Sequence, residues 1–278
     1  MNDQTPASKI GVFDSGVGGL SILKAIREEL PCSELLYVAD QAHVPYGPRP
    51  LEEVRSFSHE ITRFLLSQGA SLIVIACNTA SAAALEYLRT QFPQVPFVGM
   101  EPAVKPAVEH THSGRVGVLA TPATFQGSLY NSLVERFGKH VKIYEDTCAG
   151  LVEEIEKGDL DNQQIEKILT KALEPMLKQG IDTIVMGCTH YPFVIPQIQK
   201  ITRDAIQIID PSPAIARQTR RILLSRNIST DGNPTACIRI LTTGDAKKLA
   251  RLLPVFMGIS LPIEQLRWIA DQSLILED

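Results

Sequence analysis

The sequence predicts an α/β fold made of two pseudo-symmetric α/β domains with mostly parallel sheets, and three observations carry this prediction. Short, almost continuously apolar runs alternate with longer amphipathic segments along the chain. Two strand-and-turn patterns recur in the same order roughly a hundred residues further on. The length of 278 residues is close to that of two average domains of about 150 residues each.

Nine segments have the composition of strands that are buried on both faces, as in a parallel sheet. They are Ile10–Asp14, Leu35–Asp40, Leu72–Ala76, Phe97–Met100, Arg115–Ala120, Val141–Glu145, Thr183–Met186, Ile206–Ile209 and Cys237–Leu241. Helices are predicted between them, most clearly over Leu51–Leu66 and Asn162–Leu177, where apolar residues recur with helical spacing.

The recurring patterns indicate that the two domains are related. IGVFDSGVGGLSIL from Ile10 is echoed by VGVLATPATFQGSL from Val116, and IVIACNTAS is echoed by IVMGCTHYP, so that Cys77 and Cys188 follow equivalent strands. We expect residues 1–98 and 210–278 to form the first domain and residues 99–209 the second. The tail is expected to add a helix, a strand and a helix.

Composition and charge argue against several classes of protein. With 27 basic and 31 acidic residues the net charge is −4, so no nucleic-acid partner is expected. No run approaches the ~18 apolar residues of a membrane span, and the N-terminal MNDQTPASK lacks the apolar core of a secretory signal. We therefore expect a cytoplasmic protein whose five cysteines are reduced thiols.

Cys77 and Cys188 each follow an apolar strand and precede a predicted helix, which is where α/β sheets bind ligands. Asn78, Thr79 and Thr189 suit the N-cap position, which would leave backbone N–H groups free to bind a carboxylate. A helix N-terminus also lowers the pKa of a thiol from its free value of about 8.5. The remaining cysteines fit buried, small apolar positions: Cys32, Cys148 and Cys237.

A matched pair of thiols suggests a reaction that inverts a carbon centre. One thiolate would remove a proton, and the other thiol would return a proton to the opposite face. Two pseudo-symmetric domains would present such groups to opposite faces of one ligand, so we expect the active site in the cleft between them.

Two loops contain further candidate binding residues. The glycine-rich turn after Asp14 and Ser15 lacks the spacing of a dinucleotide-binding loop or a P-loop, but it allows close backbone approach to a ligand. Asp14 fits an ammonium-binding role and a turn-stabilising role equally well. Tyr46 and the Gly47 amide could bind a side-chain carboxylate, with an ordinary surface loop as the alternative.

His190 lies two residues after Cys188 and could polarise the thiol or assist its proton transfer. This Cys-x-His pair does not predict zinc, because no further ligand has suitable spacing. Three acids lie in one helical run nearby, and periodicity does not choose among them: Glu153, Glu154 and Glu156.

In these motifs the sequence resembles the glutamate racemases of the cofactor-independent aspartate/glutamate racemase superfamily. The motifs are FDSGVGGLS (13–21), ADQAHVPYG (39–47), ACNTAS (76–81) and GCTHYP (187–192), and the likeness extends from Ile10 to about Leu224. The resemblance implies two α/β domains, a homodimer, and interconversion of L- and D-glutamate without pyridoxal phosphate or metal. It also implies a supply of D-glutamate for peptidoglycan.

The resemblance further implies roles for individual residues. Cys77 and Cys188 match the two proton donors and acceptors, the first acting on D-glutamate and the second on L-glutamate. The substrate contacts match Asp14, Ser15, Tyr46, Gly47, Asn78, Thr79, Thr189 and His190. Asp14 and His190 also match residues that assist the thiols. A further assisting acid matches Glu156 by position in CAGLVEEIEKG, where Ala149 departs from the family's proline.

Three other functions remain open at this point. The first is racemisation of aspartate or another small acid, because the superfamily shares both cysteines. The second is a non-catalytic, carboxylate-binding regulatory protein. The third is a cysteine-nucleophile hydrolase with His190 as its base, which would leave the second cysteine unexplained.

Overall fold

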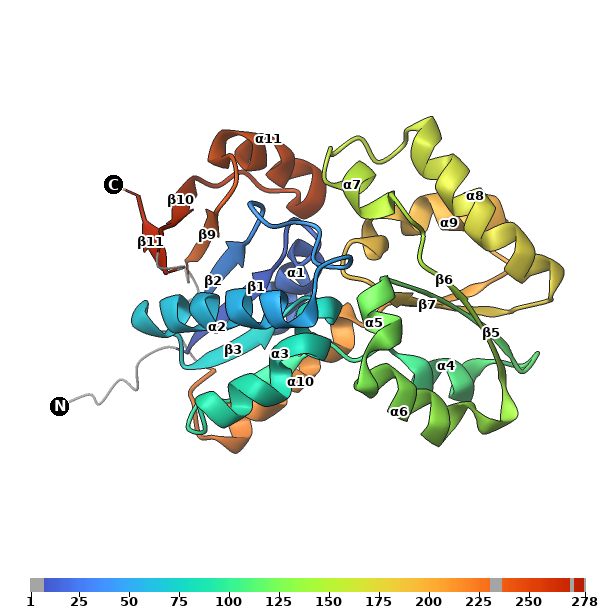
Figure 1. Cartoon of the computed structure of the whole chain (residues 1–278), viewed down its shortest axis with the longest axis horizontal. Coiled ribbons are helices and arrows are strands. Elements are labelled where there is room, and N and C mark those ends of the chain that lie inside the picture. Colours follow the sequence, from blue (N-terminus) through green and yellow to red (C-terminus); the bar gives the residue numbers. More distant parts are fainter. Residues whose placement is uncertain (1–7, 231–236, 271–272, 278) are drawn as a thin grey trace. The chain divides into compact units, whose positions relative to one another are not determined.

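The computed structural model describes residues 8–230, 237–270 and 273–277. The described chain separates into two compact units (Figure 1). The first unit contains the described residues up to Tyr46, the segment Pro50–Met100 and the described residues from Ser212 onward. The second contains Gly47–Arg49 and Glu101–Pro211.

The first unit is built on a seven-stranded sheet with the order β11-β10-β9-β2-β1-β3-β4. All pairs are parallel except β10 with β11. Its elements before the second unit are β1 (Lys9–Asp14), α1 (Leu20–Glu29), β2 (Glu34–Ala39), α2 (Leu51–Ser67), β3 (Leu72–Ile75), α3 (Asn78–Gln91) and β4 (Phe97–Gly99). Its elements after the second unit are α10 (Ser212–Ser225), β9 (Ile238–Thr242), α11 (Ala246–Met257), β10 (Ile263–Trp268) and β11 (Leu274–Leu276).

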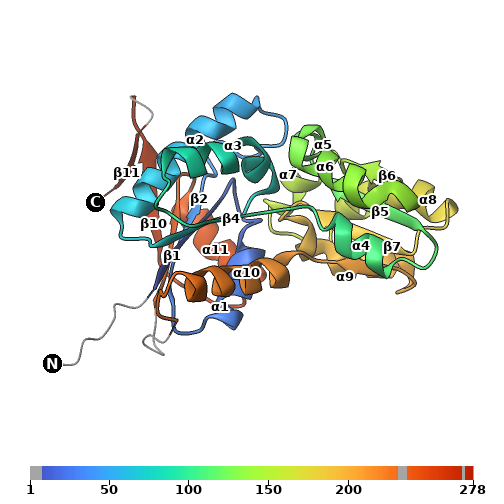
Figure 2. The same ribbon diagram turned by 90° about the horizontal axis from the view of Figure 1, so that it is seen from below.

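Helices cover both faces of this sheet. Helices α2 and α3 pack together on one face, and α1 and α10 pack together on the other (Figure 2). Phe13 of β1 lies in the core beneath α2 and α3, with Ile61 and Ala84 among its members. Gly11 leaves room for α2, because a Cβ atom at this position would lie 3.2 Å from the Cβ of Leu65. The central strand is thus buried on both faces, as its continuous apolar sequence predicts.

The second unit is built on a four-stranded parallel sheet with the order β6-β5-β7-β8. Its longer elements are α4 (Val104–His110), β5 (Arg115–Ala120), α6 (Ser128–Phe137), β6 (Lys142–Asp146), α8 (Gln163–Lys178), β7 (Thr183–Gly187), α9 (Ile195–Thr202) and β8 (Gln207–Ile209). Its shorter elements are α5 (Pro122–Gln126), η1 (Gly138–His140), α7 (Leu151–Ile155) and η2 (Tyr191–Val194).

Side chains of β5 alternate between two helical layers. Val116 and Val118 share a core with Tyr130 and other residues of α4 and α6. Gly117 faces the opposite way, where a Cβ atom would lie 3.0 Å from the sulfur of Met176 on α8. Gly117 is therefore the equivalent of Gly11. Gly11 lies on β1 beneath α2, and Gly117 lies on β5 beneath α8.

The two sheets share one strand order, which confirms the internal relationship predicted from the recurring patterns. The order β2-β1-β3-β4 in the first sheet corresponds to β6-β5-β7-β8 in the second. Cys77 follows β3 and Cys188 follows β7, which are the equivalent strands of the two sheets. All nine predicted strands are present, each within about one residue of its predicted bounds. Burial on both faces was wrongly predicted for β6 and β8, which are the edge strands of the second sheet and are partly exposed.

The tail contains more structure than the predicted helix, strand and helix. Strand β9 pairs with β2, and β10 and β11 continue the sheet beyond it. Neither β10 nor β11 is predicted by the sequence, and they are the last two strands at one end of the sheet. β10 is half-exposed and reads IEQLRW, without the continuous apolar run of a strand that is buried on both faces. Among the described residues, no helix is both long enough and apolar enough to cross a membrane.

A carboxylate ties the start of β5 to the start of β7. Asp182 accepts hydrogen bonds from the Thr111 hydroxyl (2.5 Å) and from the backbone N–H groups of His112 (2.7 Å) and Ser113 (2.6 Å). Desolvation alone would raise the pKa of Asp182, but these hydrogen bonds outweigh it and hold the pKa well below its usual range.

We predict that Asp182→Asn lowers the free energy of unfolding at pH 7 by about 1 kcal/mol, since the clamp is partly exposed to solvent and therefore partly screened. A carboxylate whose pKa is lowered by folding stabilises the protein above its unfolded pKa of about 3.9 and loses this effect as the pH falls through the folded value. The difference between wild type and variant in urea unfolding should therefore shrink between pH 5 and about pH 2. The control is Asp159→Asn at an exposed aspartate of the same unit, and equal effects of both substitutions would contradict the prediction.

Candidate active site

In the first unit, three strands end at candidate residues. Asp14 ends β1, Cys77 follows β3, and Tyr46 lies in the loop after β2. Because β1 pairs in parallel with both β2 and β3, these carboxyl ends lie at one edge of the sheet. The structure therefore brings together residues that the sequence separates widely.

Cys77 is buried and forms the N-cap of α3, where its sulfur accepts the backbone N–H of Ala80 at 3.5 Å. The prediction that Asn78 or Thr79 caps this helix is wrong, because the helix begins at Asn78 itself. The N-terminus of a helix favours negative charge on a neighbouring sulfur. The thiol is thus placed where a thiolate is stabilised.

Asn78 and Thr79 are both buried in the first turn of α3. Neither the oxygen nor the nitrogen of the Asn78 amide has a hydrogen-bond partner within the part of the chain that the structure describes. Buried polar groups are almost always paired. The unpaired amide of Asn78, next to Cys77, therefore indicates a place where a polar ligand could bind.

The glycine-rich turn is held by Asp14, which is fully buried. Its Oδ2 accepts the backbone N–H groups of Gly16 (3.2 Å) and Gly19 (3.0 Å). A Cβ atom at Gly19 would lie 2.6 Å from the Cβ of Asp14 and 2.8 Å from the hydroxyl of Tyr37, so only glycine fits. The turn-stabilising interpretation of Asp14 is thus confirmed, while its role toward substrate or thiol stays a prediction. Ser15 is buried beside it.

Tyr46 is fully buried, and its hydroxyl donates to Oδ2 of Asp40 at 2.6 Å. Burial raises the pKa of Tyr46 well above its ordinary value, and the carboxylate of Asp40 and negative charge on Cys77 and Asp14 raise it further. The phenol therefore remains a donor. The loop is an anchored segment rather than the ordinary surface loop that the sequence left open.

Gly47 belongs to the second unit, where it packs against Thr121 at the end of β5. A Cβ atom at Gly47 would lie 3.1 Å from the Cβ of Thr121, so a side chain here would force its neighbour to move. Thr121 itself caps α5 through a hydrogen bond from the N–H of Thr124. Thr121 directly follows the central strand of its sheet, as Ser15 does in the first unit. The recurring strand-and-turn pattern aligns these two residues, so the sequence contained the information needed to name Thr121 as a candidate.

In the second unit, Cys188, Thr189 and His190 follow β7 and are all buried. The approach of β7 to β5 is close, because a Cβ atom at Gly187 would lie 2.7 Å from the Cβ of Ala120. The α-helix that was predicted directly after Cys188 is absent from this place. A short 3₁₀ helix begins at Tyr191 with Pro192 in its first turn, and α9 begins only at Ile195, because Pro196 lacks the N–H that would continue one helix through both segments. Cys188 therefore lacks the helical cap that Cys77 has.

In place of that cap, Cys188 has a series of side-chain contacts that leads through His190 to Glu156. The sulfur of Cys188 lies 3.8 Å from Nδ1 of His190, and Nε2 of His190 lies 2.7 Å from Oε1 of Glu156. Burial alone would lower the pKa of His190, but the interactions with Cys188 and Glu156 outweigh it and raise the pKa well above its ordinary value. These contacts thus favour the charged imidazole over the neutral one beside the thiol.

The structure brings Glu156 to His190 from the end of α7, 34 residues away in sequence. Glu154 pairs instead with Lys157 at 2.6 Å, and Glu153 is exposed. Of the three acids that the sequence left open, it is Glu156 that reaches the histidine. Its part in catalysis stays a prediction.

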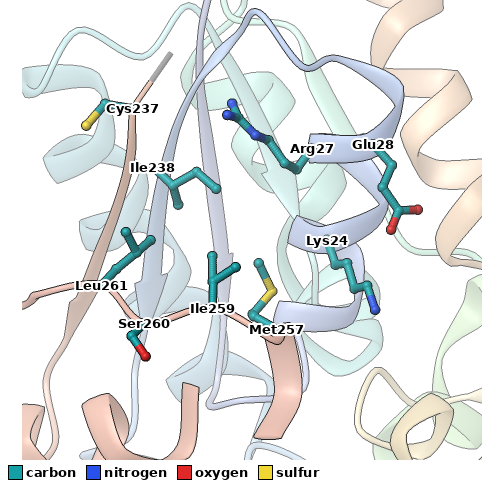
Figure 3. Close-up of a pocket in the computed structure, with 9 residues that line it drawn as sticks. All are labelled: Lys24, Arg27, Glu28, Cys237, Ile238, Met257, Ile259, Ser260 and Leu261. Atoms are coloured by element: carbon teal, nitrogen blue, oxygen red, sulfur yellow. The ribbon is translucent and has the colours of Figure 1, made fainter. Parts of the chain in front are cut away.

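The other cysteines divide by environment. Cys148 is buried, as predicted, and desolvation and the neighbouring Asp146 raise the pKa of its thiol, so that it keeps its proton. The same prediction was wrong for Cys237, which is exposed, and for Cys32, which is half-buried. Cys237 lines a cavity of about 570 Å³ with apolar neighbours such as Ile238, Met257 and Leu261 (Figure 3). None of the predicted site residues lines this cavity.

A model of the Asp/Glu/Hydantoin racemase family matches residues 10–219. The chain belongs to this family. The glutamate racemase of Pseudomonas aeruginosa is 48% identical over 252 residues, which cover 91% of this chain and 95% of that relative. The glutamate racemase of Roseiflexus is 47% identical over 257 residues, and this match covers 91% of this chain and 93% of that relative.

Solved structures of family members have the same fold. A glutamate racemase isoform from Bacillus anthracis matches with a TM-score of 0.84 and 32% identity, covering 92% of this chain and 96% of its own. The Escherichia coli glutamate racemase, solved with L-glutamate and the activator UDP-MurNAc-Ala, matches with a TM-score of 0.83 and 30% identity, covering 98% of this chain and all of its own.

We predict that Glu156→Gln lowers the pKa of His190, because the carboxylate is lost while the desolvation of the imidazole remains. The measurement is an NMR titration of the imidazole in the wild type and the variant. Glu154→Gln is the matched control, since Glu154 pairs with Lys157 and should leave the histidine unchanged. An unaltered His190 titration in Glu156→Gln would show that Glu156 does not set its charge.

Proposed function

We propose that this chain is a glutamate racemase that interconverts L- and D-glutamate by proton transfer at the α-carbon with two cysteine bases. The observation that carries the proposal is the equivalent placement of two buried thiols, each directly after the same strand of its own sheet. The family relationship and the L-glutamate in the Escherichia coli structure support glutamate as the substrate.

Inversion requires that one proton leave the α-carbon and another arrive on its opposite face. For L-glutamate, the Cys188 thiolate takes the α-proton and becomes a thiol, and the electron pair stays on the α-carbon. The Cys77 thiol then delivers its own proton to that carbon and becomes a thiolate. The reverse reaction exchanges the two roles, so no proton is gained or lost by the substrate overall.

The surroundings of each thiol suit this exchange. The cap of α3 favours the thiolate of Cys77. The charged His190 stabilises the thiolate of Cys188 and can return a proton to it, with Glu156 holding the ring. The unpaired amide of Asn78 would receive a polar group of the substrate, and the Gly47 amide would receive its side-chain carboxylate.

The cellular part of the proposal follows the family. D-Glutamate is a component of bacterial peptidoglycan, and a racemase of this kind supplies it. Cytoplasmic location and assembly as a homodimer belong to the same proposal. Sedimentation equilibrium of the purified chain would test the dimer, because a monomer at micromolar concentration would contradict it.

The two-base mechanism predicts an unequal entry of deuterium into the two enantiomers. When L-glutamate reacts in D₂O, the D-glutamate formed first should carry deuterium while the remaining L-glutamate keeps its proton, because the protonating thiol has exchanged with solvent. NMR after chromatographic separation of the enantiomers measures this directly. Equal early labelling of both pools would indicate a single base, and an absence of exchange would favour a binding protein.

Replacing either thiol should stop racemisation without unfolding the chain. We predict that Cys77→Ser and Cys188→Ser each lower kcat/KM for glutamate by about a thousandfold, because serine is a far weaker acid than cysteine. Cys32→Ser is the control, since Cys32 is half-buried and follows neither β3 nor β7. L-Aspartate is assayed in parallel, and faster turnover of aspartate than of glutamate would reassign the substrate.

A further inference from the structure

The carboxylate of Asp40, which ends the sequence-predicted strand over Leu35–Asp40, is fully buried and is surrounded by donors. Its Oδ1 accepts the Thr243 hydroxyl at 2.7 Å and the indole N–H of Trp268 at 2.8 Å. Its Oδ2 accepts the Tyr46 hydroxyl at 2.6 Å and lies 2.9 Å from Nδ1 of His43. Four side chains therefore meet on one carboxylate.

These contacts use the acceptor capacity of the carboxylate on both oxygens. A carboxylate has about four lone-pair sites, and an indole N–H and a phenol bound to it cannot rotate without losing their bonds. A buried donor or acceptor that loses its partner is costly. The orientation of the Tyr46 hydroxyl is thus coupled to Thr243 and Trp268, which lie 203 and 228 residues after Asp40 in the chain.

The C-terminal side of this arrangement is itself fixed. The backbone N–H of Thr243 donates to Ala39 at 3.1 Å, and its hydroxyl accepts the N–H of Ala42 at 3.0 Å. A Cβ atom at Gly244 would lie 2.7 Å from the Cβ of Gln41, so the loops after β2 and β9 are in direct contact. The tail therefore supplies a rigid support for the loop after β2.

The aromatic rings around the carboxylate form a second set of contacts. His43 stacks on Phe57 with 3.9 Å between ring centroids and an interplanar angle of 10°. Trp268 lies edge-on to His43 at 5.2 Å and tilted on Phe57 at 5.6 Å. Phe57 belongs to α2 and also contacts the ring of Tyr46 at 5.8 Å. The rings exclude water from Asp40 and hold the loop against α2.

We propose that Asp40 and Trp268 are positioning residues for glutamate, and that they act through Tyr46. The Tyr46 hydroxyl donates its hydrogen bond to Asp40, and this bond fixes the backbone of the loop. The group that contacts the substrate is then the backbone amide of Gly47, the next residue in the sequence. This inference rests on the proposed racemase function. It gives the C-terminal strand β10, which lies far from both cysteines in sequence, a role in substrate binding.

The test compares steady-state kinetics of Trp268→Phe and Tyr46→Phe with those of the wild type. Each substitution keeps an aromatic ring. Trp268→Phe removes the indole N–H, and Tyr46→Phe removes the hydroxyl, that donates a hydrogen bond to Asp40. Loss of a hydrogen bond to a carboxylate should raise KM for glutamate by about tenfold in each variant. The value of kcat should stay within about twofold, because the loop binds the non-reacting end of the substrate.

The double variant distinguishes positioning through Tyr46 from a general structural effect. If Trp268 acts through Asp40 and Tyr46, the combined substitution should raise KM little more than Tyr46→Phe alone. Independent structural damage would multiply the two effects to about a hundredfold and would overturn the proposal. Thermal unfolding of each variant separates loss of fold from loss of position.

A neighbouring residue provides the matched control. Arg267 precedes Trp268 on β10, points to Glu277 at 3.0 Å and is largely exposed, so Arg267→Gln should leave both kinetic constants unchanged. A wild-type KM in Trp268→Phe would refute the inference while the racemase function stands. A wild-type chain that does not racemise glutamate would refute the proposed function itself.

Discussion

The position of each thiol depends on the register between a central strand and the strand beside it. Phe13 of β1 lies opposite Ile75 of β3, and Ala120 of β5 lies opposite Gly187 of β7. In both sheets this register ends the neighbouring strand one or two residues before a cysteine. A slip by one residue would turn every side chain of that strand to the opposite face of the sheet. Buried apolar side chains on both faces hold the register and so hold the thiols.

Although the sheets are equivalent, the two thiols have different electrostatic surroundings. Cys77 relies on backbone N–H groups of α3, which are neutral and independent of pH. Cys188 lacks such a helix and relies on His190 and Glu156, which carry charge. The two bases of one reaction are therefore stabilised by different means. This difference accompanies the break between the 3₁₀ helix Tyr191–Val194 and α9, where Pro196 lacks the N–H that a continuous helix needs.

Two buried polar side chains of the first unit differ in whether their hydrogen-bonding groups have partners. Asp40 is bonded at both oxygens, which fixes the loop that carries Tyr46. The amide of Asn78 is buried without a partner among the described residues, which leaves it ready for a ligand. Full pairing gives rigidity to the support, and unpaired capacity is left where the substrate is proposed to bind.

The sequence by itself determined the α/β class, the nine strands and the internal relationship, because short apolar runs that alternate with longer amphipathic segments are typical of a parallel sheet covered by helices. It also singled out Cys77 and Cys188, because short motifs record which residues follow each strand. It did not determine the cap at Cys77, the delayed helix after Cys188, the edge strands β10 and β11 or the exposure of Cys237. The partnership of His190 with Glu156 and that of Asp40 with Trp268 join residues far apart in the chain. Only tertiary structure decides such contacts, because periodicity identifies the face of an element and not the residue that it meets.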